Sequence, residues 1–197
     1  RFAVADRLEK FTAMRSLKTI DRAGLVLQLI DAAEGLTKQD LHLTGFVQEQ
    51  NKGILLLVNK WDLLDADWEE YEKRLRRGMG DLADIAIFPI SASKGYNCLN
   101  IFKEVEKISR ALNKKISTSQ LNKILEGALS AHHLPVHRGK PIKIYYATQV
   151  GVNPPTFALF SNFPAAVPYT YRRYLVRKLQ DALGIRGVPV RIVCRRK

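Results

Sequence analysis

Two unbroken runs of apolar residues, each followed at once by polar ones, are the clearest pattern along this chain. The run at residues 54–58 reads Ile-Leu-Leu-Leu-Val and leads into Asn59-Lys60-Trp61-Asp62. The run at residues 85–90 reads Ile-Ala-Ile-Phe-Pro-Ile and leads into Ser91-Ala92-Ser93-Lys94-Gly95. Apolar runs of this length predict strands buried on both faces, which are typical of parallel sheets. Leu25–Ile30 predicts a third buried strand, which ends at Asp31.

Segments with apolar residues at helical spacing separate these strands. They predict helices from about Asp6, from Thr37, from Trp68 to Arg77 and from Leu99 to Leu112. The second helix begins with Thr37-x-x-Asp40, the pattern of a capping box. Alternating strands and helices predict an α/β unit with a parallel sheet and helices on both faces.

The pattern changes after the polar run that begins at Lys114. A helix, two strands, a helix and a strand are expected at residues 117–131, 142–148, 156–161, 168–183 and 188–195. This α-β-β-α-β order predicts a small α+β layer. In the second helix the expected buried stripe consists of Tyr171, Leu175, Leu179 and Ala182. In the first strand Ile142, Ile144 and Tyr146 are expected on one face, with Lys143 and Tyr145 on the other.

Charge divides the chain at the same place. Of the formal charge of +13, residues 1–115 contribute only +2, with 19 Lys/Arg and 17 Asp/Glu. Residues 116–197 contribute +11, because 13 Lys/Arg are offset by Glu126 and Asp181 alone. A near-neutral part joined to a basic part predicts two domains, 1–115 and 116–197, the second facing a polyanion such as RNA. The candidate RNA contacts are basic residues on outward faces, namely Lys143, Arg172, Arg173, Arg177, Lys178, Arg191 and Arg195. The alternative is that these residues only form a solvated face.

Other composition signals bound the class of protein. No apolar run approaches the ~20 residues that cross a bilayer, so no membrane contact is expected. Cys98 and Cys194 lack metal or redox spacing and are expected to be free thiols in the reducing cytoplasm. His132, His133 and His137 have no carboxylate or cysteine nearby, so no metal site is predicted.

The residues that follow the two central strands have the chemistry of a guanine site. Ligands of open α/β sheets sit at the carboxyl ends of the strands. Asp62 offers two acceptor oxygens that match the N1–H and N2–H donors of guanine, whereas adenine presents an acceptor at N1. Asn59 can both donate and accept, which suits a tether to the neighbouring loop, and Lys60 can lay its methylene stem along the ring.

These two loops together resemble the guanine-specificity loops of the Ras-like GTPases. The resemblance implies GTP or GDP as ligand, with Ser91, Ala92 and Lys94 lining the far side of the base. The phosphate-binding Gly-x-x-x-x-Gly-Lys-Ser/Thr motif is absent, since Gly139-Lys140 is followed by Pro141. No catalytic residue is therefore assigned, Mg²⁺ would be held through residues outside this chain, and the chain alone is expected to hydrolyse no GTP. We also expect Arg1 to lie inside a longer natural chain.

Nearly the whole sequence is similar to one bacterial family, the tandem GTPases of large-subunit ribosome assembly (Der, or EngA). Asn59-Lys60-Trp61-Asp62, Tyr145-Tyr146-Ala147, Asn153-Pro154-Pro155 and the segment 187–192, Gly-Val-Pro-Val-Arg-Ile, carry this resemblance. It implies that residues 1–115 are the end of an incomplete Ras-like domain and that residues 116–197 form a KH-like domain. It further implies an upstream GTPase domain, and ribosomal RNA and a large-subunit precursor as partners.

Two alternatives to this assignment stay open. The basic part could be an RNA-binding module only, with the other part as scaffold. The chain could also resemble Era, another bacterial GTPase with a KH domain, in which a Gly-x-x-Gly loop grips the nucleic acid. Here Gly184-Ile185-Arg186-Gly187 has the right letters but lies between a helix and a strand, so it is expected to be a helix cap and turn.

Overall fold

The first part of the chain is built on a parallel sheet. The structure is a computed structural model that describes residues 19–185 and 187–197. Strands β1 (Leu25–Asp31), β2 (Gly53–Asn59) and β3 (Ala86–Pro89) pair in the order β1-β2-β3, all parallel. The central strand β2 is buried from Gly53 to Val58, because it has a neighbour on each side and helices on both faces. The predicted parallel sheet is confirmed.

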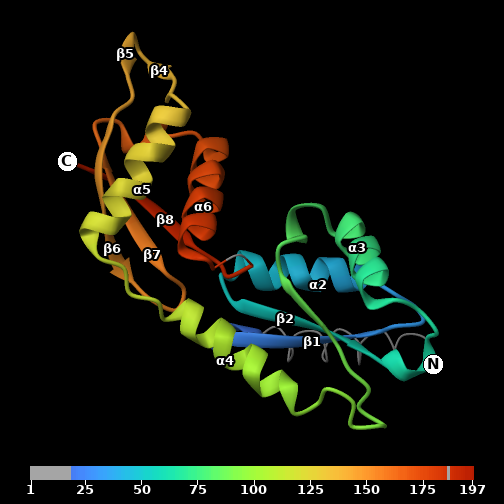
Figure 1. The fold of residues 1–197 in the computed structure, drawn as a ribbon. Coiled ribbons are helices and arrows are strands. Elements are labelled where there is room, and N and C mark those ends of the chain that lie inside the picture. Colours follow the sequence, from blue (N-terminus) through green and yellow to red (C-terminus); the bar gives the residue numbers. More distant parts are fainter. Residues whose placement is uncertain (1–18, 186) are drawn as a thin grey trace, which may run out of the picture.

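Within the described residues, helices on both faces cover this sheet (Figure 1). Helices α2 (Lys38–Glu49) and α3 (Trp68–Met79) share a buried cluster with Ile54, Leu56 and Val58 of β2. Helix α4 (Asn100–Leu112) packs on the other face, where Leu55 and Leu57 point. The Thr37 capping box forms as expected, since its side chain accepts from the Asp40 backbone and Asp40 accepts in return. Short 3-10 turns lie at Trp61–Leu63, Gly80–Leu82 and Pro164–Ala166.

The prediction that Leu25–Ile30 is a buried strand was wrong for one of its faces. Leu27 and Leu29 are 43% and 55% exposed, whereas Gln28 and Ile30 are buried. Among the described residues β1 is the edge of the sheet, and the buried cluster that α4 shares with β2 includes Leu25 of β1 but neither Leu27 nor Leu29. Most of the helix expected from about Asp6 lies outside the described residues.

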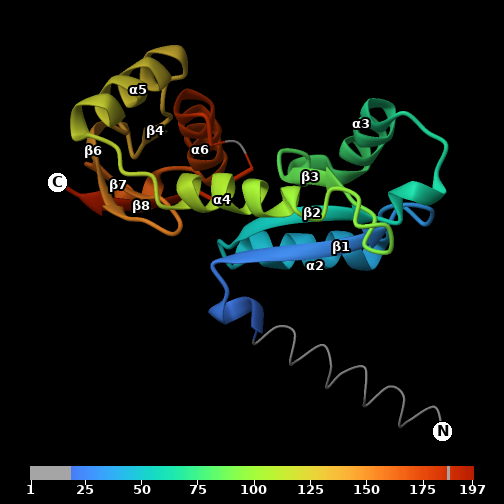
Figure 2. The ribbon, with the colours of Figure 1, turned by 60° about the horizontal axis from the view of Figure 1, so that its bottom comes forward.

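The second part is an α+β layer with both helices on one face of a sheet (Figure 2). Strands β6 (Ile144–Gly151), β7 (Thr156–Ser161) and β8 (Arg191–Arg196) pair in the order β6-β7-β8. β7 is antiparallel to β6 and parallel to β8. Helices α5 (Thr118–Ala131) and α6 (Tyr169–Leu183) complete the predicted α-β-β-α-β order.

Two details of this layer differ from the expected burial. Leu183, and not Ala182, completes the buried stripe of α6, because spacing of four residues from Leu179 carries the stripe to the last helical position. In β6 a bulge between Ile144 and Tyr146 shifts the alternation by one residue. Ala147 is therefore fully buried, while Tyr146 is half-buried and stacks on Phe160 with ring centroids 4.4 Å apart.

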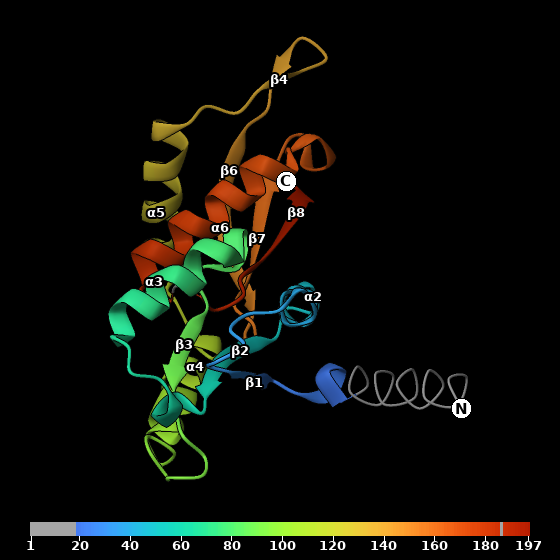
Figure 3. The same ribbon diagram turned by 90° about the vertical axis from the view of Figure 1, so that its right-hand side faces the viewer.

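A small hairpin projects from the end of this layer (Figure 3) and was not predicted. It consists of β4 (Val136–His137) and β5 (Lys140–Pro141), joined by Arg138 and Gly139. Both turn residues have positive φ, 52° and 72°, as a two-residue hairpin turn requires.

The two parts of the chain share buried apolar residues. One cluster contains Leu55, Ile108 and Leu112 from the first part together with Leu121 and Phe157 from the second. Polar contacts reinforce the junction: the Gln149 amide accepts from Ile116 N–H and donates to the Lys114 carbonyl, both at 2.8 Å.

A glycine fixes one point of closest approach between the parts. A Cβ placed on Gly187 would lie 2.2 Å from the Asp84 carbonyl oxygen, and Gly187 has a φ of +75°. Gly184 ends α6 in the left-handed conformation. Gly184 is thus a helix cap, as predicted, and the close contact of Gly187 with the Asp84 backbone was not predicted.

Candidate functional site

The register of the parallel sheet brings the polar loops to one edge. Asp31 is paired with Asn59, and Val58 with Pro89, so all three strands end together. Beyond the strands the backbone contacts continue, since the Ile90 N–H donates to Val58 and the Trp61 N–H donates to the Ile90 carbonyl at 3.1 Å. The carboxyl ends of the strands therefore form one continuous loop surface, as expected for a ligand-binding edge.

Asn59 joins the two loops. Its side-chain Oδ1 accepts a hydrogen bond of 3.0 Å from the backbone N–H of Ala92. The amide predicted to tether the neighbouring loop has this contact. Any role of Asn59 or Ala92 toward a base stays a prediction.

Lys60 is turned toward the end of β1. Its Nζ lies 2.6 Å from Oδ2 of Asp31, and its backbone is left-handed with a φ of 61°. The hydrogen bond from Lys60 lowers the pKa of Asp31, and the hydrogen bond to Asp31 raises the pKa of Lys60. The sequence showed a lysine that could lie along a base, but Asp31, 29 positions earlier, had no signal that marked it as its partner.

Asp62 lies on the short turn after Lys60 and is exposed to solvent. Within the described parts of the chain, no hydrogen bond or ion pair engages its carboxylate. The turn itself is held by Trp61, whose ring meets those of Trp68 and Tyr71 edge-on at centroid distances of 5.2 and 5.1 Å. The Tyr71 hydroxyl in turn donates to the Ala32 carbonyl at 2.8 Å. The turn thus exposes the Asp62 carboxylate as an acceptor, while the packing of Trp61 on α3 holds the turn in place.

The second loop is shaped by Ser91. Its side chain is fully buried, and its Oγ accepts from the Lys94 N–H at 3.2 Å. The Ser91 N–H donates to the Tyr96 carbonyl, so this group, like that of Ala92, is bonded within the protein. Ala92 and Lys94 are exposed. The structure therefore brings Asn59, Ser91, Ala92 and Lys94 to the same edge as Lys60 and Asp62.

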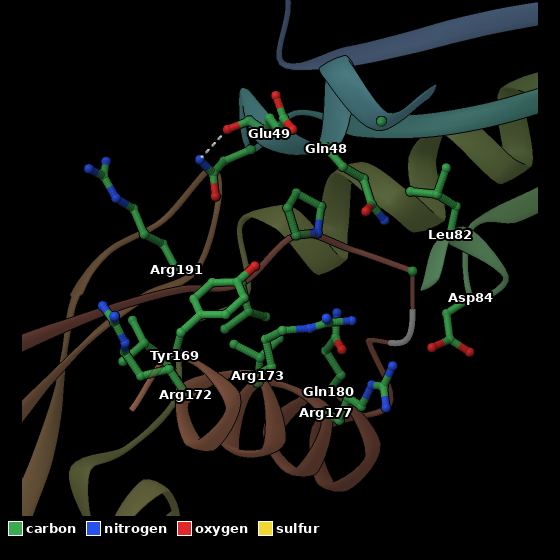
Figure 4. Close-up of a pocket in the computed structure, with 17 residues that line it drawn as sticks. Gln48, Glu49, Leu82, Asp84, Tyr169, Arg172, Arg173, Arg177, Gln180 and Arg191 are labelled. Carbon is green, nitrogen blue, oxygen red and sulfur yellow. Dashed lines mark hydrogen bonds between the residues drawn. The ribbon is translucent and has the colours of Figure 1, made fainter. Parts of the chain in front are cut away.

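A second candidate site is a cleft between the two parts of the chain (Figure 4). We call it the arginine cleft; its cavity volume is about 580 Å³. One wall, from α6 and β8, carries Arg172, Arg173, Arg177 and Arg191, four of the predicted RNA contacts. The facing wall includes the end of α2, with Gln48 and Glu49.

The other predicted RNA contacts lie elsewhere. Lys143 is exposed just before β6, and its backbone N–H donates to Asn162 Oδ1. Lys178 is exposed beside the Tyr174 ring, and Arg195 is exposed near the end of β8. The cleft could not be found by sequence reasoning, because α2 and α6 lie more than 100 positions apart. Tyr169 was also missed, since an aromatic residue after a proline has no periodic signal.

The described residues contain no group of three or more His, Cys, Asp and Glu side chains arranged to hold a metal. His132 instead packs edge-on against Tyr174 at 4.7 Å, and His137 packs against Phe163 at 5.4 Å. No helix in the described ranges has the length and apolar character needed to cross a membrane.

Comparison with known proteins gives consistent matches. Residues 115–195 match the family described as the KH-domain-like C-terminal region of EngA bacterial GTPases. The protein named GTPase Der from Syntrophotalea carbinolica is 41% identical over 192 residues, which cover 96% of this chain and 44% of that protein. GTPase Der from Trichlorobacter lovleyi is 37% identical over 194 residues, or 97% of this chain and 43% of that protein. The chain thus spans less than half the length of these relatives.

A more distant likeness links the chain to a solved structure of Era in complex with MgGDPNP and a segment of 16S ribosomal RNA. The two are 19% identical, with 92% of this chain and 67% of that chain covered and a TM-score of 0.42. This value is too low to support a functional assignment.

Proposed function

Because the chain matches the C-terminal region of the Der (EngA) GTPases, we propose that it is the guanine-reading and RNA-contacting part of a bacterial GTPase that acts in ribosome assembly. Residues 1–115 would be the end of a Ras-like GTPase domain, and residues 116–197 the KH-like domain. GTP or GDP, with Mg²⁺ held by other residues of the full-length protein, is the proposed ligand. The proposed partner is ribosomal RNA in a precursor of the large subunit, and the proposed location is the cytoplasm.

The observation that carries the nucleotide assignment is the pair of loops joined by the Asn59–Ala92 hydrogen bond. This bond fixes the second loop beside the turn on which the Asp62 carboxylate is exposed. The two acceptor oxygens of Asp62 can pair with the two adjacent donors of guanine, while adenine would leave them unpaired. In this proposal Asn59, Lys60, Asp62, Ser91, Ala92 and Lys94 form the guanine site.

The test is calorimetric titration of GDP and ADP into the full-length protein and its Asp62→Asn variant. We expect GDP to bind, ADP to fail, and Asp62→Asn to weaken GDP binding by at least about a hundredfold, since a buried donor of the base loses its acceptor. Asp65→Asn is the matched control, because Asp65 is an exposed carboxylate three positions further along. GDP binding that is indifferent to Asp62 would reduce the loop to a structural turn.

The chain by itself should bind guanine nucleotide weakly and hydrolyse no GTP, because its sequence lacks the phosphate-binding motif. Measurable turnover by the purified chain would contradict this part of the proposal.

A second candidate function, RNA binding by the KH-like part alone, is favoured by the concentration of arginines on α6 and β8. RNA affinity should then fall steeply with salt, because neutralised phosphates release counterions. Replacing Arg173 and Arg177 by Gln should weaken binding to all RNA sequences and flatten the salt dependence. An unchanged affinity would remove this face of α6 from the RNA contact.

A further inference from the structure

We propose that the arginine cleft binds one unpaired nucleotide of a single-stranded RNA, with its phosphate at Arg172 and Arg191 and its base stacked on Tyr169. The inference rests on the proposed RNA contact of the basic part. The proposal adds that the RNA is single-stranded and that its nucleotide lies in a defined pocket, one wall of which comes from the first part of the chain.

Tyr169 supplies the stacking surface. It is the first residue of α6, it is 67% exposed, and it lines the cleft (Figure 4). The guanidinium carbon of Arg172 lies 6.0 Å from the centre of its ring. An exposed aromatic ring beside arginines is the arrangement by which proteins hold single-stranded bases, because every base has a face that can stack.

Arg172 and Arg191 supply the phosphate contact. They come from different elements, α6 and β8, and both line the same cleft. In residues 19–185 and 187–197 no carboxylate pairs with either side chain. Within those ranges, Nε of Arg172 is buried and has no hydrogen-bond partner. Because Nε itself is buried, a phosphate would contact Arg172 through its terminal guanidinium nitrogens, which have no protein acceptor in the described ranges.

The opposite wall orients the ligand. It is formed by the carboxyl end of α2, where the helix dipole is negative, and it carries the carboxylate of Glu49. A phosphate is repelled there and attracted to the arginines, so the base must point toward α2. The Gln48 amide can then donate to or accept from the edge of the base, and the Glu49 carboxylate can accept from it.

The size of the cleft suits one nucleotide, and the Tyr169 ring selects an unpaired one. A cavity of about 580 Å³ lies within the range of small-ligand pockets and can take one nucleotide. Both faces of a base in a duplex are covered by its neighbours, so a base must leave its stack to lie on the Tyr169 ring, which selects loops, bulges or single strands. The mode differs from a KH grip through Gly-x-x-Gly, because here Gly187 is in contact with Asp84.

The test measures binding of a fluorescent, unstructured 12-nucleotide RNA to the 197-residue chain by anisotropy. Tyr169→Ala should weaken binding about tenfold, whereas Tyr169→Phe should bind as the unaltered chain does, since stacking needs only the ring. Tyr145→Ala is the control: Tyr145 is 46% exposed in the same part of the chain but does not line the cleft. Arg191→Gln should lower affinity and reduce the slope of log K against log salt by about 0.7, while Tyr169→Ala leaves the slope unchanged.

Competition experiments distinguish a nucleotide from free phosphate as the ligand of the cleft. Uridine monophosphate at millimolar concentration should displace the RNA from the unaltered chain, and inorganic phosphate at equal ionic strength should not. If both compete equally, the cleft is only an anion site and the proposal fails. If RNA binds but Tyr169→Ala matches Tyr145→Ala, the nucleotide pocket is excluded while the proposed RNA contact stands. If no RNA binds, both fail.

Discussion

Oδ1 of Asn59 accepts a 3.0 Å hydrogen bond from the backbone N–H of Ala92, 33 positions further along the chain. The bond joins the ends of β2 and β3 through a side chain, at the point where the sheet itself has stopped. The geometry of the second loop therefore depends on an amide in the first.

Replacing Asn59 by Ala should lower the free energy of unfolding by about 1 kcal/mol, because one hydrogen bond at an exposed position is lost. GDP affinity of the full-length protein should fall by a larger factor, since the loops lose their alignment. Asn59→Asp keeps the acceptor for Ala92 and should recover most of the stability. Urea unfolding followed by Trp fluorescence measures the first effect and calorimetry the second. Equal losses of stability and GDP affinity in Asn59→Ala and Asn59→Asp would show that the hydrogen bond to Ala92 does not cause them.

The Asp31–Lys60 pair predicts a pH dependence. The pKa of Asp31 is lowered below its usual 3.8, so the pair's contribution is present above that pH and is lost as the pH falls through the lowered value. The pKa of Lys60 is raised above 10.5, so the stability that the pair contributes is lost again as the pH rises through this raised pKa. Carboxyl-carbon NMR titration should show the Asp31 pKa returning toward 3.8 in Lys60→Met. Lys52→Met is the control, because Lys52 bonds the Asp21 carbonyl instead. An Asp31 pKa that stays low in Lys60→Met would assign the shift to backbone donors.

Tyr71→Phe should destabilise the chain by about 1 to 3 kcal/mol, because the buried Ala32 carbonyl loses its donor. The emission of Trp61 should also change, since its ring lies 5.1 Å from that of Tyr71. Tyr96→Phe removes the hydroxyl of a half-exposed tyrosine and should have little effect on either quantity. Thermal unfolding and Trp emission spectra of both variants provide the comparison, and indistinguishable results would contradict the anchoring role.

Gly187→Ala should cost about 3 kcal/mol or more, because the new Cβ would collide with the Asp84 backbone at a residue with positive φ. Gly184→Ala isolates the conformational part of this cost. Gly184 also has positive φ, +63°, but nothing lies within 4 Å of its Cβ position, so about 1 kcal/mol is expected. Denaturant unfolding of the two variants gives the difference. Equal costs would mean that the two parts of the chain separate easily at this contact.

The sequence predicted most of the fold because several signals agreed. β2 was identified by five apolar residues without interruption, and α2 by its capping box. The β4–β5 hairpin was missed because strands of two residues carry no alternation. The burial of Leu27 and Leu29 was overestimated, since an apolar residue in a strand does not reveal whether the strand lies at an edge.

The functional sites were predictable only where they are local in sequence. Asn59, Lys60 and Asp62 follow one strand directly, so the sheet register alone placed them at the edge. The arginine cleft depends on the placement of α6 opposite the end of α2, and the sequence of neither helix contains information about the other. Asp31 was visible as the end of a strand, but its ion pair with Lys60 depends on the left-handed backbone at Lys60.

Helix α4 belongs to both parts of the molecule. Its residues Ile108 and Leu112 lie in the same buried cluster as the second sheet, and the Leu112 carbonyl accepts from the Asn153 N–H at 2.8 Å. The change of charge near residue 115 therefore marks a boundary in composition, but the two parts are expected to unfold together. Separating the halves would expose apolar side chains on both, so the described chain should unfold in a single transition and neither half should be an independent folding unit.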